Sequence, residues 1–252
     1  MISAFFASLN DYSRALKFMS THKLWGFAML PGLASLVLAG LSMYAAYKYS
    51  GTLGDSLAGF YPGDWPLSGA IDEILAGLAF IISIIVFLLL AKYVVVIIAS
   101  PFLGPLSEKV ESLATGKPAP PFSLKDMAED LARAIRISLR NVIRELFLNL
   151  VLLLLNLVPF LGSVAYTIAI FAVQSYYAGF GNMDPTLERQ RYTVRQRVQF
   201  VRKHRGLAIG NGLPFVLLML VPVIGWFLAP VLGVVAATLS TVKVLEKGAF
   251  HR

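Results

Sequence analysis

The sequence contains no cysteine, which excludes disulfide bonds, thiolate metal sites and cysteine nucleophiles. It has only three histidines, and these lie far apart in the chain: His22, His204 and His251. A histidine-rich metal site is therefore not expected. The sequence also lacks GxSxG, HExxH and P-loop motifs, and it has no GxGxxG placed after a strand. We accordingly expect no enzyme activity, no metal and no cofactor.

Charged residues are scarce as well. They make up 14% of the 252 residues, whereas soluble proteins average about 25%. Hydrophobic residues make up 57% of the chain, and the mean hydropathy is +0.72. Long apolar stretches account for the difference, so the composition predicts an all-α integral membrane protein. The net charge of +8 lies beside these stretches, where positive charge sets topology and meets anionic headgroups. We therefore expect membrane lipids, and not nucleic acid, as partners.

The segment 1–23 predicts an amphipathic helix at the membrane surface. Its apolar residues recur every three or four positions: Phe5, Leu9, Tyr12, Leu16 and Met19. Charged residues interrupt the segment, so it does not have the long apolar core of a signal peptide.

Two stretches are long and apolar enough to cross a bilayer core of about 30 Å. The first covers 24–47 and the second covers 74–99. Lys92 lies inside the second span, where it either reaches the membrane face or belongs to a conduction path. The loop between the spans, 48–73, has one basic and four acidic residues, which predicts that it is external.

Basic residues are concentrated in the amphipathic segment 100–145 and in a helix at 180–208, with seven in each. The positive-inside rule places both segments, the N-terminus and the tail 243–252 on the cytoplasmic side of the membrane. The chain must then leave the cytoplasm and return twice. We expect a single membrane domain over 1–252, with a first hairpin (146–179) and a second hairpin (209–242).

A repeated sequence marks the two hairpins: LNLVPFLG at 155–162 and LMLVPVIG at 218–225. Proline cannot continue a helix interior, and glycine allows the chain to reverse. We therefore expect the hairpin tips at four residues: Pro159, Gly162, Pro222 and Gly225. The arms are short for a full crossing. Each hairpin is either an ordinary spanning pair or a re-entrant hairpin whose tip ends inside the membrane.

Polar residues are aligned within the apolar arms of the first hairpin. They form one stripe on each arm: Glu145, Asn149 and Asn156, then Ser163, Thr167 and Gln174. These side chains either form hydrogen bonds between the arms or line a solute path. Four are candidate pathway-lining residues: Glu145, Asn149, Asn156 and Gln174.

Three stretches carry a resemblance to a known family: SPFLGPLSEKVE (100–111), FGNMDPTLER (180–189) and LVPVIGWFLAPVLGVVAATL (220–239). Their order along the chain resembles the CysZ-type sulfate permeases, the membrane proteins with the etoposide-induced-protein domain. The resemblance implies an inner-membrane protein with two long transmembrane helices and two pairs of shorter helices. It also implies assembly into homo-oligomers, and sulfate uptake that supports cysteine synthesis.

The chain departs from the family pattern in two places. The resemblance implies an anion-binding Gly-Leu-Arg type motif before the first span, but the matching stretch, HKLWGFAMLP (22–31), contains no arginine. The expected anion-binding residues are therefore Lys23, Leu24, Trp25 and Gly26, with backbone N–H groups as further donors. After the first hairpin, Asn182 and Pro185 replace the tyrosines of a Tyr-x-Asp-Tyr pattern.

Two functions are compatible with these features. The first is a permease or channel-like transporter that passes sulfate or a similar small oxyanion, with basic residues attracting the anion at the inner mouth. Because no ATP motif is present, transport would be passive or ion-coupled. The alternative is a non-transporting membrane scaffold or lipid-binding protein of the same fold, favoured by the arginine-rich helix at 189–205. An anion affinity that depends on Lys23 would separate the two.

Overall fold

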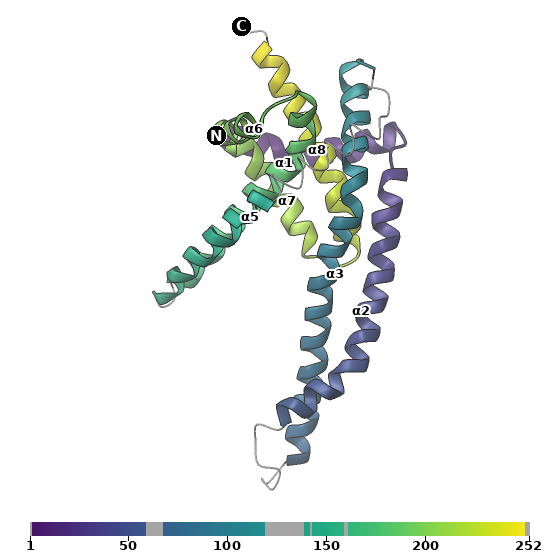
Figure 1. Cartoon of the computed structure of the whole chain (residues 1–252), viewed down its shortest axis with the longest axis vertical. Coiled ribbons are helices and arrows are strands. Elements are labelled where there is room, and N and C mark those ends of the chain that lie inside the picture. The colour runs from purple at the N-terminus through teal and green to yellow at the C-terminus, as the bar shows by residue number, and fades with distance from the viewer. Residues whose placement is uncertain (1, 59–67, 119–138, 142, 159–160, 250–252) are drawn as a thin grey trace.

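The computed structural model describes residues 2–58, 68–118, 139–141, 143–158 and 161–249, and every element in these ranges is helical (Figure 1). The all-α prediction is confirmed. In chain order the elements are α1 (Ile2–Thr21), α2 (Gly26–Ala58), α3 (Ser68–Thr115), a helical stretch at 139–141 and 143–152, η1 (Leu153–Leu157), α5 (Leu161–Arg189), α6 (Val194–Lys203), α7 (Arg205–Met219) and α8 (Ile224–Ala249).

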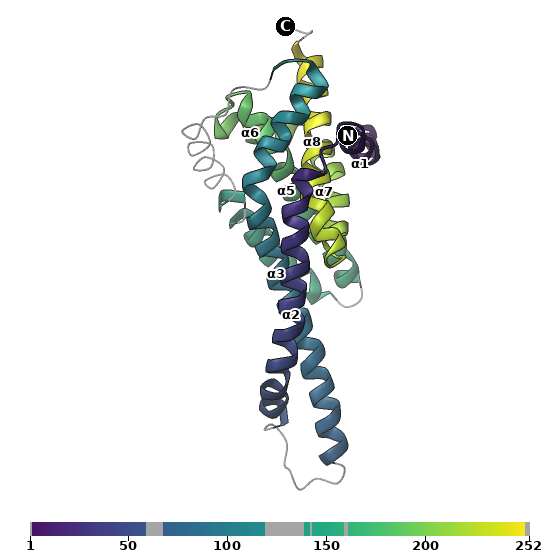
Figure 2. The same cartoon turned by 90° about the vertical axis from the view of Figure 1, so that its right-hand side faces the viewer.

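Two of the described helices are long and apolar enough to cross a membrane: Gly26–Thr52 within α2 and Ile224–Glu246 within α8. The predicted second span, 74–99, lies inside α3, which is 48 residues long and runs antiparallel to α2 (Figure 2). The hairpin formed by α2 and α3 extends well beyond the other helices in both views. The side chain of Lys92 lies outside the described part of the chain.

Both long helices continue past the ends of the predicted spans. α2 extends to Ala58 and α3 begins at Ser68, so much of the predicted loop 48–73 is helical. These turns add length at the end of the hairpin that lies farthest from the remaining helices (Figure 2).

The other end of α3 continues through Pro101 to Thr115, into the segment predicted to be cytoplasmic. These last turns stay helical because they pack against other helices: Leu106 and Val110 are fully buried. The middle of the predicted amphipathic segment 100–145 lies outside the described residues, at 119–138.

α1 packs across α7 and α8, and only part of its apolar face is buried there. The buried residues are Ser8, Asp11, Ala15 and Met19, whereas Leu16 is 46% exposed. Small side chains face α7 because the helices approach closely: a side chain at Gly210 would overlap the backbone of Phe5.

α8 lies at the centre of the helical group and contacts α1, α2, α3, α5 and α7. Its side chains from Val231 to Val235 are almost completely buried. A buried polar link fixes three of these helices together. The Asn182 amide on α5 donates to the Asn211 side-chain oxygen on α7 (2.9 Å), and the Asn211 amide donates to the Gly233 carbonyl on α8 (3.2 Å).

The tip of the second hairpin corrects one expectation about glycine. Gly225 does not make the reversal; it lies in the first turn of α8. The left-handed residue is Val223, with φ of 63°, directly after Pro222. This conformation is unfavourable for a β-branched residue. Gly225 instead allows close packing, because a Cβ at this position would overlap the carbonyl oxygen of Leu218.

The first hairpin uses its glycine in the same way. Gly162 lies in the first turn of α5, and a Cβ there would overlap the carbonyl oxygen of Leu155. Pro159 lies outside the described residues. The role of Gly162 is therefore close contact between the arms.

The two hairpins are placed differently in the molecule. α7 and α8 pack within the helical group, whereas the first hairpin projects away from it (Figure 1). Leu157 and Leu161, near its tip, are 78% and 77% exposed. The returning helix α5 continues past Gly179 into the group and ends at Arg189. The predicted basic helix at 180–208 is thus divided among α5, α6 and the start of α7.

Candidate functional site: an arginine-lined cavity

The candidate site lies at the base of the first hairpin, where α5 enters the helical group. α5 is fixed there by close contact with α7. A Cβ at Gly179 or at Gly212 would overlap a backbone carbonyl oxygen of the opposite helix, so the two backbones touch. This contact sets the position of three neighbouring side chains on α5 that line the site: Tyr176, Tyr177 and Phe180.

α6 forms another wall of the site, and its orientation is set locally. Thr193 begins the helix with a capping box: its hydroxyl accepts from the Gln196 N–H (3.4 Å), and the Gln196 side chain accepts from the Thr193 N–H (2.8 Å). Val198 and Val201 are buried against the helical group. The helix therefore presents a fixed face, with Arg202 in its last turn.

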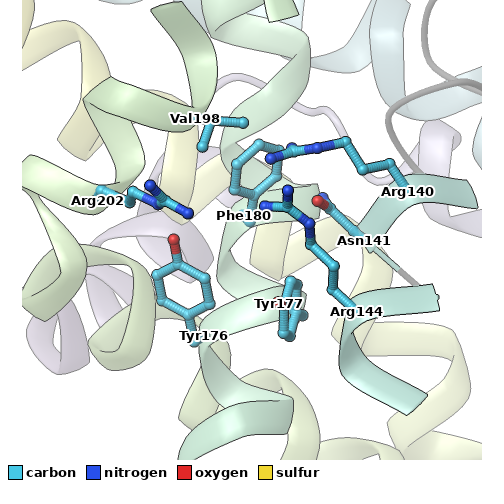
Figure 3. Close-up of a pocket in the computed structure, with 8 residues that line it drawn as sticks. All are labelled: Arg140, Asn141, Arg144, Tyr176, Tyr177, Phe180, Val198 and Arg202. Carbon is cyan, nitrogen blue, oxygen red and sulfur yellow. The ribbon is translucent and has the colours of Figure 1, made fainter. Parts of the chain in front are cut away.

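Between 140–144, α5 and α6 lies a cavity of about 130 Å³. Three arginines reach it: Arg140 and Arg144 from successive turns of one helix, and Arg202 from α6. Figure 3 shows their guanidinium groups turned toward the same space, with the Tyr176 hydroxyl directed toward Arg202. Asn141, which is 8% exposed, adds an amide.

The electrostatics of the cavity are strongly positive. None of the described residues that line it is acidic. Partial burial, and then the positive charges of Arg144 and Arg202, hold the pKa of Arg140 below its ordinary value. Like charges at i and i+4 on a helix are destabilising. Such a cluster is therefore suited to holding an anion.

Two carboxylates on α5 are paired with a different arginine. Arg197, on α6, is almost fully buried and donates to Asp184 (3.1 Å), to Glu188 (3.0 Å) and to the Tyr192 carbonyl (2.9 Å). Burial raises the pKa of Asp184 to about 6; the nearby charge of Arg197 opposes the shift, and the charge of Glu188 adds to it. This group holds α6 on α5, and it uses both carboxylates.

A second polar group joins α3, α5 and α8. Arg189 donates to the Glu111 carboxylate (2.7 Å) and to the Ser107 hydroxyl (2.8 Å). Ser107 is also hydrogen-bonded to Thr238, with 2.7 Å between the two hydroxyl oxygens. Each charge in this group has an opposite partner, so its arrangement stabilises helix packing. Among the described residues, no group of three or more His, Asp and Glu side chains gathers where it could hold a metal ion.

The predicted anion-binding stretch forms the turn between α1 and α2. Lys23 is exposed and has φ of 54°, and its N–H donates to the Ser20 carbonyl (3.4 Å). Leu24 is 4% exposed and belongs to the hydrophobic core, and its N–H donates to the Met19 carbonyl (2.9 Å). These two N–H groups are already used. Those of Trp25 and Gly26 lie at the start of α2.

The four predicted pathway residues lie on the arms of the first hairpin, and no hydrogen bond among the described residues joins them. Asn156 is exposed, and Glu145 and Gln174 are half-buried. The Asn149 side-chain oxygen is buried and has no hydrogen-bond partner among the described residues. Thr167 donates within its own helix, to the Ser163 carbonyl (2.8 Å), and so does not link the arms.

The comparison with known proteins identifies the family. Residues 11–230 match the family described as "Sulfate transporter CysZ/Etoposide-induced protein 2.4". The chain belongs to this family. The CysZ sulfate transporter of Vibrio cholerae serotype O1 is 26% identical over 228 residues, which cover 87% of each protein. The CysZ sulfate transporter of Vibrio parahaemolyticus serotype O3:K6 is 26% identical over 220 residues, covering 81% of this chain and 82% of the relative.

The sequence of this CysZ family member predicts that its basic segments set the topology and attract an anion, but it does not predict that these three arginines converge. Arg140 and Arg144 belong to one basic segment and Arg202 to another. Their i, i+4 spacing places the first two on one helix face. Nothing in the sequence indicates that α6 folds back against that face, because this contact depends on the buried pair of Arg197 with Asp184.

Proposed function

We propose that this chain is a membrane permease, or channel-like transporter, for sulfate or a similar small oxyanion. The observation that carries the proposal is the CysZ family match over residues 11–230. The long apolar helices support a membrane location. The arginines at one end of the helical group support an anionic solute, because a cationic entrance raises the local anion concentration.

The proposed topology places both termini and the basic segments in the cytoplasm of a bacterial inner membrane. α1 and the end of α8 lie at the same end of the molecule, opposite the end of α2 and the start of α3, which supports this placement (Figure 1). We propose that the hairpin tips end within the membrane. In support, the α2–α3 hairpin extends far beyond both tips (Figure 2).

Single-cysteine variants test this topology without background labelling, since the natural chain has no cysteine. The test uses sealed, right-side-out membrane vesicles. An impermeant maleimide added outside should label Asp55→Cys at once, and it should label Arg195→Cys only after the vesicles are permeabilised. Leu220→Cys, at the second tip, should resist labelling from both sides. Labelling of Leu220→Cys from outside would contradict the re-entrant proposal and favour full crossing.

Transport is tested by uptake of radioactive sulfate into proteoliposomes that contain the purified chain. We expect saturable uptake that excess unlabelled sulfate suppresses and that chloride suppresses far less. Lys23→Ala should weaken uptake if residues 23–26 contact the anion, and Asn149→Ala and Asn156→Ala should change its rate if they line the path. Uptake equal to that of empty liposomes would overturn the permease proposal.

The second candidate function is lipid binding or scaffolding without transport. It is favoured by the exposed cations of α6, Arg195, Arg202 and Lys203, which suit an anionic membrane surface. Binding to anionic vesicles without any sulfate uptake would support this alternative. Assembly into homo-oligomers remains a prediction, and size-exclusion chromatography with light scattering tests it.

A further inference from the structure

The arginine-lined cavity differs in its counter-ions from the two arginine clusters that hold the helices together. Arg197 is paired with Asp184 and Glu188, and Arg189 is paired with Glu111. These pairs use the carboxylates that lie closest to the cavity along α5. Among the described residues, no carboxylate forms an ion pair with Arg140, Arg144 or Arg202.

The position of the three guanidinium groups is not explained by packing. Arg144 and Arg202 are exposed and could extend into solvent, yet both turn toward the cavity that Arg140 also reaches (Figure 3). Bringing three like charges together is unfavourable unless an anion neutralises them. The same walls offer an amide from Asn141 and a hydroxyl from Tyr176, which also donate hydrogen bonds to an oxyanion.

The dimensions fit one small anion. A volume of about 130 Å³ is several times larger than the space that one water molecule needs in a cavity. A tetrahedral oxyanion with one central atom and four oxygens fits within that volume. Guanidinium groups present planar pairs of N–H donors that match two oxygens at once, so three arginines favour a doubly charged oxyanion over a spherical halide.

We propose that this cavity is a binding site for a tetrahedral, doubly charged oxyanion, either free sulfate or the phosphate of a lipid headgroup. The choice of sulfate as the first probe rests on the proposed function. The site is distinct from residues 23–26: Figure 2 shows α6 and α1, which precedes that stretch, on opposite sides of α8. The permease would then hold its anion at the base of the first hairpin.

The first test is arginine footprinting of the wild-type, full-length protein in detergent, which avoids any folding defect of a variant. Phenylglyoxal modifies exposed arginines, and peptide mass spectrometry reads each position. Sulfate at millimolar concentration should reduce modification of Arg144 and Arg202 at least fivefold. Arg195, exposed on the same helix α6, should change less than twofold. Equal protection at all three positions would contradict a defined site.

Binding of radioactive sulfate to variants is the second test. Arg144→Gln and Arg202→Gln should each weaken affinity at least tenfold, and Tyr176→Phe, which keeps the charge, severalfold. Arg195→Gln is the matched control with the same loss of charge and should bind within twofold of wild type. If the cavity variants bind sulfate like the control, the site proposal is wrong.

The outcomes also separate the site from the function. Uptake that persists with unchanged affinity in Arg144→Gln and Arg202→Gln would overturn the site and leave the permease standing. Sulfate protection of the cavity without uptake would leave the site and overturn the permease. In a parallel arm, short-chain phosphatidic acid replaces sulfate; protection by this lipid alone would assign the site to a headgroup. Protection by neither anion would reject the proposal.

Discussion

The two hairpins carry the same tip sequence, Leu-x-Leu-Val-Pro-x-x-Gly, and use its glycine in the same way, yet only the second is part of the core. The residue after that glycine differs. In the second hairpin it is Trp226, which is 2% exposed, packs with Val95 on α3 and donates to the Met219 carbonyl (3.2 Å). In the first hairpin it is Ser163, which is exposed. The shared motif therefore specifies the turn, and the next residue decides what the turn packs against.

The largest expected effect on the free energy of unfolding comes from removing the Trp226 side chain, which only the second hairpin has. Trp226→Ala should lower the free energy of unfolding by about 3–5 kcal/mol, because it leaves a cavity between the second hairpin and α3. Ser163→Ala should change it by less than about 0.5 kcal/mol. Thermal unfolding in detergent, followed by circular dichroism, measures both. Similar losses for the two variants would show that the first tip is packed as tightly as the second.

A smaller effect is expected from the tip glycines. Gly225→Ala should cost about 1–3 kcal/mol, because the new methyl group overlaps the Leu218 carbonyl and α8 cannot shift within the core. Gly162→Ala makes the same local overlap with Leu155, but the projecting arm can open, so its cost should be less than half as large.

Gly181→Ala controls for the substitution itself, since Gly181 lies on α5 with no atom near the new methyl group. It should leave stability unchanged or raise it slightly. The same melting experiment reads all three glycine variants. A cost for Gly162→Ala equal to that for Gly225→Ala would mean that the first hairpin is not free to relax.

The last prediction concerns pH and probes the base of the first hairpin. Burial raises the pKa of Asp184 from 3.8 to about 6, so the folded chain holds this proton more tightly than the unfolded chain. The contribution of Asp184 to stability is therefore present below pH 3.8 and is lost as pH rises to about 6. Wild type should lose stability relative to Asp184→Asn across this window. A constant difference between their melting temperatures from pH 4 to 7 would contradict the shift.

The sequence predicted the helical class and the family, because the first depends on local composition and the second on short stretches of sequence. The apolar periodicity of α1 did not indicate which of its residues contact the neighbouring helices. Ser8 lies outside the apolar stripe, yet it is buried where α1 meets Gly210. Such a choice depends on the partner helix, and apolar periodicity within α1 does not record it.

The candidate site was missed for a similar reason. Arg140 and Arg144 lie far from Arg202 in the chain, and each was accounted for by the positive-inside rule. Their convergence requires α6 to fold against α5, which depends on buried pairing of Arg197 with Asp184. The predicted residues 23–26 and the polar stripes were chosen from a family pattern and from helix spacing, neither of which reports on three-dimensional convergence.

The contact of α5 with α7 has a mechanical consequence. Gly179 and Asn182 hold the inner half of α5 against α7. The outer half of α5 projects away from the helical group, so only the inner half is fixed in place. Tyr176 and Tyr177, which line the arginine-lined cavity, lie next to this fixed part of α5. A movement of the projecting half of α5 would change the width of the cavity, and a bound anion would oppose that movement. Spin labels at the first tip and on α8 should therefore show a narrower distribution of distances when sulfate is present. An unchanged distribution would show that movement of α5 does not depend on whether the cavity is occupied.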